Sequence, residues 1–163
     1  MVAIWEMAER HGLWVVEDAA QAMGAHHGGR KVGSDPRSVA SVYSFHPNKN
    51  MTTGEGGALV LHDDRLLDRA KRLRFHGIEK DAWKRFSKEG SPHTEVMEPG
   101  RKANLMDIQA ALGLHQLKKL DGFNARRGVL FRRYLELLKG TDGLVLPWEG
   151  DAVHGHCFHL FVL

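Results

Sequence analysis

The chain opens on a helical pattern that leads directly into a short apolar run, and this order constrains the fold more than any other feature. The residues from Ile4 to His11 have the i, i+3, i+4, i+7 spacing of an amphipathic helix, and Gly12 stands where a glycine commonly ends a helix. Residues 13–16 are all apolar, which is typical of a strand buried on both faces. A helix that runs straight into a buried strand predicts an α/β fold.

Periodic patterns further along the chain agree with that fold. Their spacing predicts strands over 38–45 and 58–61 and helices over 65–74, 106–120 and 124–138. The last of these helices repeats apolar residues at helical spacing, which indicates a core or a subunit interface rather than a cofactor site.

Two other stretches raise separate expectations. Residues 76–103 are polar and contain several glycines and prolines, and a loop of this length is usually functional or mobile. The chain ends within the apolar run 158–163, which predicts a strand, and it starts on a helix that should follow a strand. We therefore interpret the sequence as a fragment of a larger protein.

Composition excludes several classes of protein. Hydrophobic residues make up 42% and charged residues 26% of the chain, which is ordinary for a globular domain. No apolar run reaches about 18 residues, so no membrane span is expected. The net charge of +3 comes without the interleaved aromatic residues of a nucleic-acid groove. The single cysteine, Cys157, permits no internal disulfide and fits a cytoplasmic location.

Three features near the predicted strands suggest a ligand site. Asp18 ends the first strand region, at the edge where open α/β sheets bind ligands, and a buried carboxylate there needs a cation. Lys49 follows the strand over 38–45, has no carboxylate at helical spacing, and comes shortly after Ser44. The run 52–57, Thr-Thr-Gly-Glu-Gly-Gly, is a turn that lets the backbone approach a bulky group. Each feature alone also fits a capping aspartate, a surface lysine or a hairpin turn.

Together these residue types suit pyridoxal phosphate. This cofactor needs a lysine amine for its Schiff base, a carboxylate against the pyridine nitrogen and a hydroxyl near its phosphate. A lysine without an ion-pair partner fits the first role, because desolvation frees the amine for nucleophilic attack.

Sequence motifs in a fixed order cover nearly the whole chain. They lie at 16–22, 44–50, 53–57, 74–77, 99–100, 104–114 and 159–161. With these motifs the chain resembles the DegT/DnrJ/EryC1/StrS aminotransferases, which use pyridoxal 5'-phosphate to aminate nucleotide-linked keto-sugars. The resemblance implies part of the large domain of the fold-type-I, aspartate aminotransferase-like α/β fold, with a mixed, mostly parallel sheet flanked by helices.

The resemblance also implies roles for individual residues. Lys49 matches the lysine that forms the Schiff base, and Asp18 matches the partner of the pyridine nitrogen. Gln21 matches a position beside the cofactor ring, and Ser44 matches a hydroxyl that binds the phosphate. Asn104 resembles an asparagine that reaches the phosphate of the neighbouring subunit's cofactor, which implies a homodimer with a shared active site.

The substrates follow from the same resemblance. They are a nucleotide-linked 4-keto-sugar and glutamate as the amino donor. The stretches at 75–77, 82–83, 95–100 and 156–161 are most similar to the branch that makes UDP-4-amino-4-deoxy-L-arabinose for lipopolysaccharide. His159 resembles a residue near the sugar-nucleotide pocket, and a strand histidine satisfied by its neighbours is the alternative.

The chain departs from the family pattern in two respects. Ala103 stands where the family has an aromatic residue, and the early segments with the cofactor phosphate loop are absent. The resemblance places residues 1–120 in the cofactor-binding large domain, and 121–163 in a connecting helix and the start of the small C-terminal domain. With phosphate contacts from Ser44 and Asn104 alone, the chain is expected to bind the cofactor poorly.

Three other interpretations stay open. The dehydratase branch of the family carries histidine at the position of Lys49, so the lysine counts against it. A truncated, catalytically inactive chain with only a dimerisation role is the second. The third is a metal site, although its histidines are irregularly spaced and no carboxylate joins them. These histidines are His26, His27, His154, His156 and His159.

Overall fold

The computed structural model describes residues 1–78, 95–148 and 154–163. These residues form two compact units. Unit 1 comprises the described residues of Met1–Val60 and Asp107–Leu163, and unit 2 comprises those of Leu61–Met106. The predicted division into residues 1–120 and 121–163 concerns the complete protein and stays a prediction.

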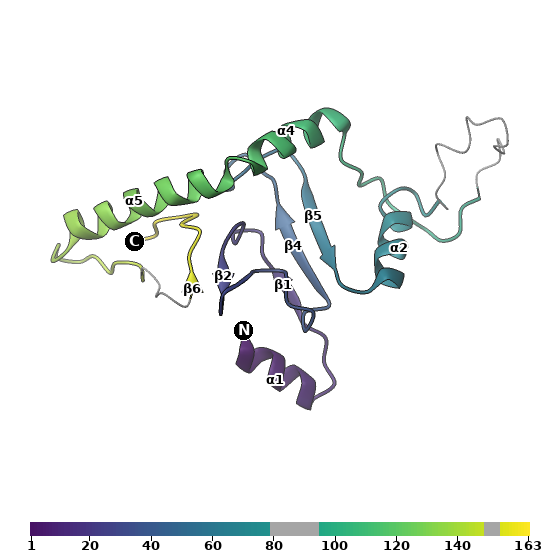
Figure 1. Cartoon of the computed structure of the whole chain (residues 1–163), viewed down its shortest axis with the longest axis horizontal. Coiled ribbons are helices and arrows are strands. Elements are labelled where there is room, and N and C mark those ends of the chain that lie inside the picture. The colour runs from purple at the N-terminus through teal and green to yellow at the C-terminus, as the bar shows by residue number, and fades with distance from the viewer. Residues whose placement is uncertain (79–94, 149–153) are drawn as a thin grey trace. The chain divides into compact units, whose positions relative to one another are not determined.

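Unit 1 holds most of the regular structure (Figure 1). Its helices are α1 (Val2–Arg10), α4 (Asp107–Leu117) and α5 (Leu120–Leu138). Its strands are β1 (Val16–Asp18), β2 (His26–His27), β3 (Arg30–Lys31), β4 (Ala40–Ser44), β5 (Gly57–Leu61, which ends at the boundary with unit 2) and β6 (His154–Gly155). The strands predicted over 38–45 and 58–61 correspond to β4 and β5, and α4 and α5 confirm the two predicted helices.

The strands form two three-stranded sheets. The first has the order β1-β4-β5 and the second has the order β3-β2-β6. β1 and β4 are parallel, and their register runs from Val16↔Ala40 to Asp18↔Val42. Figure 1 shows β5 running opposite to β4, so the first sheet is mixed, as the resemblance implies. In the second sheet, β2 pairs antiparallel with both β3 and β6.

The first strand begins later than the sequence predicts. Gly12 has φ of +61° and closes α1 as expected, but Leu13 belongs to the same cap because its N–H donates to the Ala8 carbonyl at 2.8 Å. Leu13 and Trp14 are 63% and 88% exposed, so the prediction of a strand buried on both faces over 13–16 is wrong. Only one face of β1 is covered, and on it Glu17 is buried.

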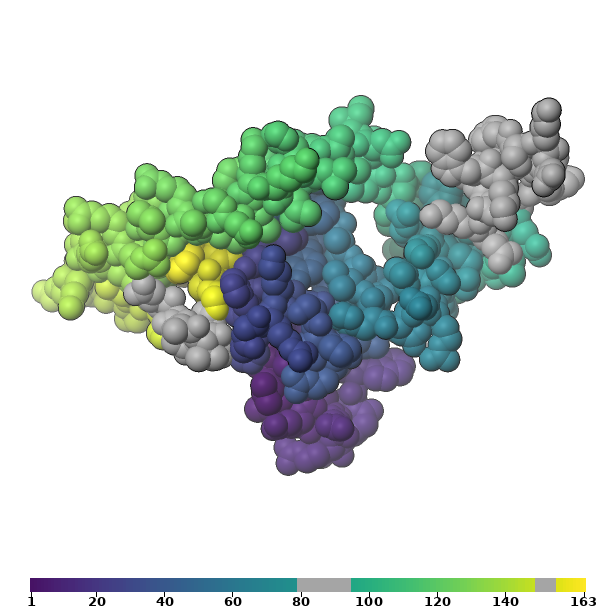
Figure 2. Space-filling model, in the orientation of Figure 1, coloured from purple at the N-terminus to yellow at the C-terminus, as the bar shows by residue number. Residues whose placement is uncertain are grey.

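The C-terminal apolar run is not a strand. Phe158 has φ of +51°, in the left-handed region that no strand residue adopts, so pairing ends at β6 and the prediction over 158–163 is wrong. The run packs its rings on α5 instead, with Phe158 and Phe161 centred 5.0 and 4.9 Å from the buried Phe131. Figure 2 shows these C-terminal residues, in yellow, against α5, in green. The predicted apolar stripe of α5 is therefore core at Phe131, whereas Tyr134 is exposed.

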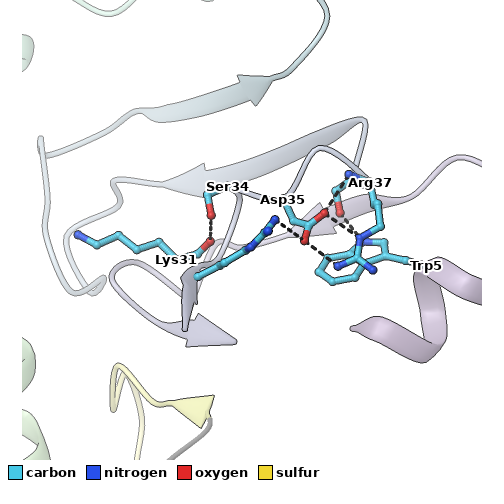
Figure 3. A network of polar contacts seen from close by, with 7 residues as sticks. Trp5, Lys31, Ser34, Asp35 and Arg37 are labelled. Carbon is cyan, nitrogen blue, oxygen red and sulfur yellow. Dashed lines mark hydrogen bonds and ion pairs between the residues drawn. The ribbon is translucent and has the colours of Figure 1, made fainter. Parts of the chain in front are cut away.

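A polar network fastens α1 to the segment that precedes β4 (Figure 3). The Trp5 indole donates to the Ser38 hydroxyl at 2.8 Å, and the Arg37 guanidinium lies over the Trp5 ring at 4.1 Å. The buried Asp35 accepts from Arg37 Nη2 at 2.8 Å and pairs with Arg30 at 3.4 Å. The Arg37 hydrogen bonds hold the pKa of the Asp35 carboxyl far below its ordinary value. We call the residues Trp5, Arg30, Asp35, Arg37 and Ser38 the Asp35 network.

Unit 2 is built on α2 (Asp64–Leu73), which confirms the helix predicted over 65–74. Asp63 caps it by accepting from the Arg65 N–H at 2.8 Å. Gly77 and Gly100 approach so closely that a Cβ on either one would meet the other's backbone, so both positions need glycine. Of the loop predicted over 76–103, residues 79–94 lie outside the described residues.

No helix in the described parts of the chain has the length and apolar character that crossing a bilayer requires.

Candidate active site

The parallel pair β1 and β4 ends at one edge of the first sheet. Asp18 is the last residue of β1 and Ser44 is the last residue of β4. Asp18 is in register with Val42, and side chains alternate along a strand, so Asp18, Val42 and Ser44 share one face. Ligands of open α/β sheets bind at this carboxyl edge.

Asp18 is held by its own turn and by nothing else among the described residues. Its Oδ1 accepts from the Ala20 N–H at 3.0 Å. The side chain is exposed, so the sequence argument that a buried carboxylate there needs a cation is wrong. An exposed, unpaired carboxylate is instead free to meet a ligand.

Lys49 lies in the turn that follows β4. Its N–H donates to the His46 carbonyl at 3.0 Å, which closes the turn. The residue is half-buried, and within the described chain its ammonium group makes no hydrogen bond and no ion pair. The structure thus confirms the prediction that this lysine has no carboxylate partner in the described chain.

The glycine-rich run after Lys49 folds back on the end of β4. The Phe45 carbonyl accepts from Thr53 N at 3.1 Å and from Thr52 Oγ1 at 2.9 Å, so one oxygen anchors the turn twice. Gly54 has φ of +81°, where a side chain would be strained. This turn fixes the backbone on the C-terminal side of Lys49.

His159 lies in the C-terminal segment of unit 1 and is only 7% exposed. Both of its ring nitrogens lack a hydrogen-bond partner, which is costly for a buried polar group unless a ligand supplies one. Burial lowers the pKa of the imidazole, and the positive charges of Lys49 and Arg127 lower it further. The ring is therefore neutral at pH 7. No described residue satisfies either ring nitrogen, so the structure does not support the alternative of a histidine satisfied by its neighbours.

His159 and Arg127 border a cavity of about 160 Å³ between α5 and the C-terminal segment. Arg127 Nη1 donates to the His159 carbonyl at 3.2 Å. The other residues that line the cavity are apolar or aromatic: Leu130, Phe131, Tyr134, Phe158 and Phe161.

The remaining predicted site residues fall in different places. Ser44 Oγ is half-buried and accepts from the His46 N–H at 3.3 Å. Gln21 has an exposed side chain, and its carbonyl accepts from Cys157 Sγ at 3.0 Å. Asn104 is exposed and belongs to unit 2. Unit 1 therefore contains five of the six predicted residues, and one of the two predicted phosphate ligands, Ser44.

Asn50 and Asn124 are polar residues of this region to which the sequence gives no role. Asn50, next to Lys49, is buried and donates to the Asn124 side chain and to the Cys157 carbonyl, both at 2.6 Å. Its place beside the apolar Met51 is the one local hint that it is buried. The sequence offers no signal for hydrogen-bond partners that lie 74 and 107 residues away.

The donor set fits pyridoxal phosphate. Lys49 offers an amine without a competing partner, Asp18 offers an exposed carboxylate, and Ser44 offers a hydroxyl at the same sheet edge. The described residues contain no group of three His, Cys, Asp or Glu side chains that could hold a metal ion, so the histidine-rich alternative gains no support there.

Comparison with known proteins defines the class. The fold matches TlmJ, an aminotransferase from Streptoalloteichus hindustanus, with a TM-score of 0.85 and 32% identity over 98% of this chain and 40% of that one. It also matches Spr1654 from Streptococcus pneumoniae, a putative sugar aminotransferase solved in its PLP form, with a TM-score of 0.78 and 26% identity over 91% of this chain and 36% of that one. The described structure thus has the fold of part of the large domain of fold-type-I, aspartate aminotransferase-like proteins.

The family follows from the sequence comparison. The pattern of the DegT/DnrJ/EryC1/StrS aminotransferase family matches residues 1–163, and the chain belongs to that family. It is 44% identical over its whole length to the spore coat polysaccharide biosynthesis protein SpsC of Bacillus subtilis (strain 168), and spans 41% of the length of that relative.

Proposed function

We propose that this chain supplies the lysine-bearing part of a pyridoxal-phosphate-dependent aminotransferase that transfers an amino group from glutamate to a nucleotide-linked 4-keto-sugar. The observation that carries the proposal is the unpartnered Lys49 beside the sheet edge that bears Asp18 and Ser44. The family and the PLP form of Spr1654 support the choice of cofactor.

Lys49 and Asp18 perform the chemical roles. Bound pyridoxal phosphate supplies an electron sink for charge that develops at the carbon bearing the amine. Lys49 would hold the cofactor through its side-chain amine, and the freed amine would move a proton to and from that carbon as the general acid and base. The Asp18 carboxylate keeps a proton on the ring nitrogen, which only an anionic partner stabilises well.

The other residues hold the cofactor and the sugar nucleotide. Ser44 donates to the phosphate, Gln21 lies beside the ring, and Asn104 reaches the phosphate of a second subunit. His159 donates to or accepts from the sugar nucleotide through one of its free ring nitrogens. A neutral imidazole can do either, because one nitrogen carries a proton and the other does not.

A homodimer follows from the proposed role of Asn104. Exposed apolar side chains on α4 support it: Ile108 is 83% exposed, and Leu114 and Leu117 are exposed on the same helix. A chain that only covers such a surface, without catalysis, is the alternative function. A cytoplasmic location stays a prediction.

Peptide mapping separates these functions. The protein as its gene encodes it is incubated with pyridoxal phosphate, reduced with borohydride, digested and analysed by mass. We expect one pyridoxyl label, on Lys49, and none in Lys49→Ala; the matched control Lys118→Ala, an exposed lysine, keeps the label. A parent protein that carries no label, or carries it on other lysines, contradicts the aminotransferase and leaves the inert chain.

The acceptor is tested by substrate choice. With glutamate as donor, the resemblance to the arabinose branch favours a UDP-linked 4-keto-pentose over a 4-keto-hexose on the same nucleotide. The opposite preference assigns the chain to another branch of the family. Turnover with neither sugar contradicts the proposed acceptor class.

A further inference from the structure

Two asparagines flank Lys49, and their surroundings differ. Asn48 is exposed, and its side chain makes a contact within its own turn, where its Oδ1 lies 2.8 Å from His46 Nδ1. Asn50 is 5% exposed, and both bonds from its amide nitrogen reach distant parts of unit 1. One bond joins Asn124 of α5, and the other joins the Cys157 carbonyl.

Asn124 and Cys157, the two partners of Asn50, each make a further hydrogen bond to the segment that follows β1. Asn124 Nδ2 donates to the Met23 carbonyl at 3.0 Å, and Cys157 Sγ donates to the Gln21 carbonyl at 3.0 Å. Gly24, with φ of +82°, leaves room for this arrangement, because a Cβ there would lie 2.5 Å from Asn124 Nδ2. The Asn50 network, which consists of Asn50, Asn124, Cys157 and the Gln21 and Met23 carbonyls, thus joins four segments.

Each of these segments carries or adjoins a site residue. The lysine turn carries Lys49, and the segment after β1 carries Gln21. The C-terminal segment carries His159, two residues after Cys157, and α5 carries Arg127, which donates to the His159 carbonyl. The network therefore fixes the frame in which the Lys49 amine, the Gln21 side chain and the His159 ring are held.

No other side chain can readily substitute for Asn50, because its amide group donates two hydrogen bonds within the network. Both amide hydrogens of Asn50 point at oxygen acceptors, and the side chain is buried, so its removal leaves two acceptors without their donor. Buried acceptors that lose a donor cost more than the bond itself is worth, so the segments separate locally rather than stay in place. An aspartate at this position would place a carboxylate oxygen, which cannot donate, against the Asn124 Oδ1 and Cys157 carbonyl acceptors.

We infer that Asn50 is a positioning residue for Lys49: it holds the backbone of the lysine turn against α5 and the segment of His159, and so sets where the lysine amine meets the cofactor. The inference rests on the proposed function for its catalytic consequence. The network itself stands on the hydrogen bonds of unit 1.

The test compares Asn50→Ala and Asn50→Asp with the matched control Asn48→Ala in the protein as its gene encodes it. The first measurement needs no cofactor: it is the alkylation rate of Cys157, followed by mass on the peptide that contains this residue. We expect both Asn50 variants to react about tenfold faster or more, because Cys157 shares the network, and Asn48→Ala to react like the parent. A parent-like rate in the Asn50 variants overturns the network.

The second measurement reports on the lysine. After addition of pyridoxal phosphate, the pH midpoint of the visible band and the share of borohydride-trapped label on Lys49 are recorded. We expect the Asn50 variants to shift the midpoint and lose label from Lys49, and Asn48→Ala to match the parent. Asn50 variants with faster Cys157 alkylation but parent-like midpoint and label have a structural defect alone, which overturns the positioning role.

The two proposals fail in different ways. A parent protein without label on Lys49 contradicts the proposed function, whereas a labelled parent with parent-like Asn50 variants contradicts only the positioning role. If the Asn50 variants do not fold, Asn124→Ala removes one of the two acceptors; we expect it to shift the midpoint in the same direction and by less. An unchanged midpoint in Asn124→Ala overturns the inference.

Discussion

Asp35 and Asp18 are carboxylates of the same unit, and they differ in what surrounds them. Asp35 is buried and receives two guanidinium groups, one of which also covers the Trp5 ring. Asp18 is exposed and accepts one N–H from its own turn. In the same unit, the side-chain nitrogens of Lys49 and His159 are also left without hydrogen-bond partners among the described residues.

The difference separates stability from function. A polar group whose partners are complete, such as Asp35, fixes the fold and has nothing to offer a ligand. Groups without partners at a sheet edge contribute little to stability but remain available for binding and proton transfer. The following substitutions test whether the two regions divide in this way.

The largest effect is expected at Asp18. Asp18→Asn should lower transamination by roughly 100-fold or more, because the amide cannot hold the ring nitrogen protonated. The denaturation midpoint in urea should stay that of the parent, since the side chain is exposed. Asp142→Asn, which changes an exposed carboxylate outside the site, is the control for both measurements. Turnover close to the parent's in Asp18→Asn would remove Asp18 from the site.

Asp35→Asn should give the reverse result. The loss of the carboxylate leaves the guanidinium of Arg37 without its closest partner, so the melting temperature should fall by several degrees while turnover per folded molecule is kept. The folded pKa of Asp35 lies below its ordinary 3.8, so its contribution to stability is present above that pH and is lost as the pH falls further. Thermal melts from pH 7 to pH 3 should show this loss in the parent and not in the variant.

A smaller effect is expected from His159. Its pKa in the folded state is lowered from 6.5, so below about pH 6.5 the unfolded chain binds a proton that the folded chain does not. Stability should therefore fall as the pH drops from 7.5 toward 5.5. His159→Gln should flatten part of this dependence in urea unfolding, whereas His115→Gln on the exposed side of α4 should not. An unchanged pH dependence in His159→Gln would show that the ring is not held neutral.

The smallest effect concerns the lysine turn. Gly54→Ala places a side chain at φ of +81° and should destabilise the protein by about 1–2 kcal/mol, because L-residues are strained there. Gly122→Ala in α5 has open space around it and should stabilise by about 0.5–1 kcal/mol, because alanine favours a helix. Urea unfolding measures both. Equal effects in the two variants would show that the turn carries no conformational constraint.

Much of the local structure could be predicted from the sequence, because helix periodicity, caps and glycine turns are encoded within a few neighbouring residues. α1 with its Gly12 cap, β4, β5, α2, α4 and α5 were predictable in this way, and so was the lysine without a carboxylate partner. The apolar runs at 13–16 and 158–163 were not, since an apolar run suits a strand, a helix cap or a coil packed on a helix equally well.

The sequence by itself determined the family, through motifs whose order and residue types need no coordinates, and the candidate residues Lys49, Asp18 and Ser44. Only the tertiary structure decided that Asp18 is exposed, that His159 is buried with free nitrogens, and that Asn50 is bonded across 74 and 107 residues of chain. The physical reason is that burial and long-range hydrogen bonds depend on which segments the fold brings together, and neither leaves a periodic trace in the sequence around the residue concerned.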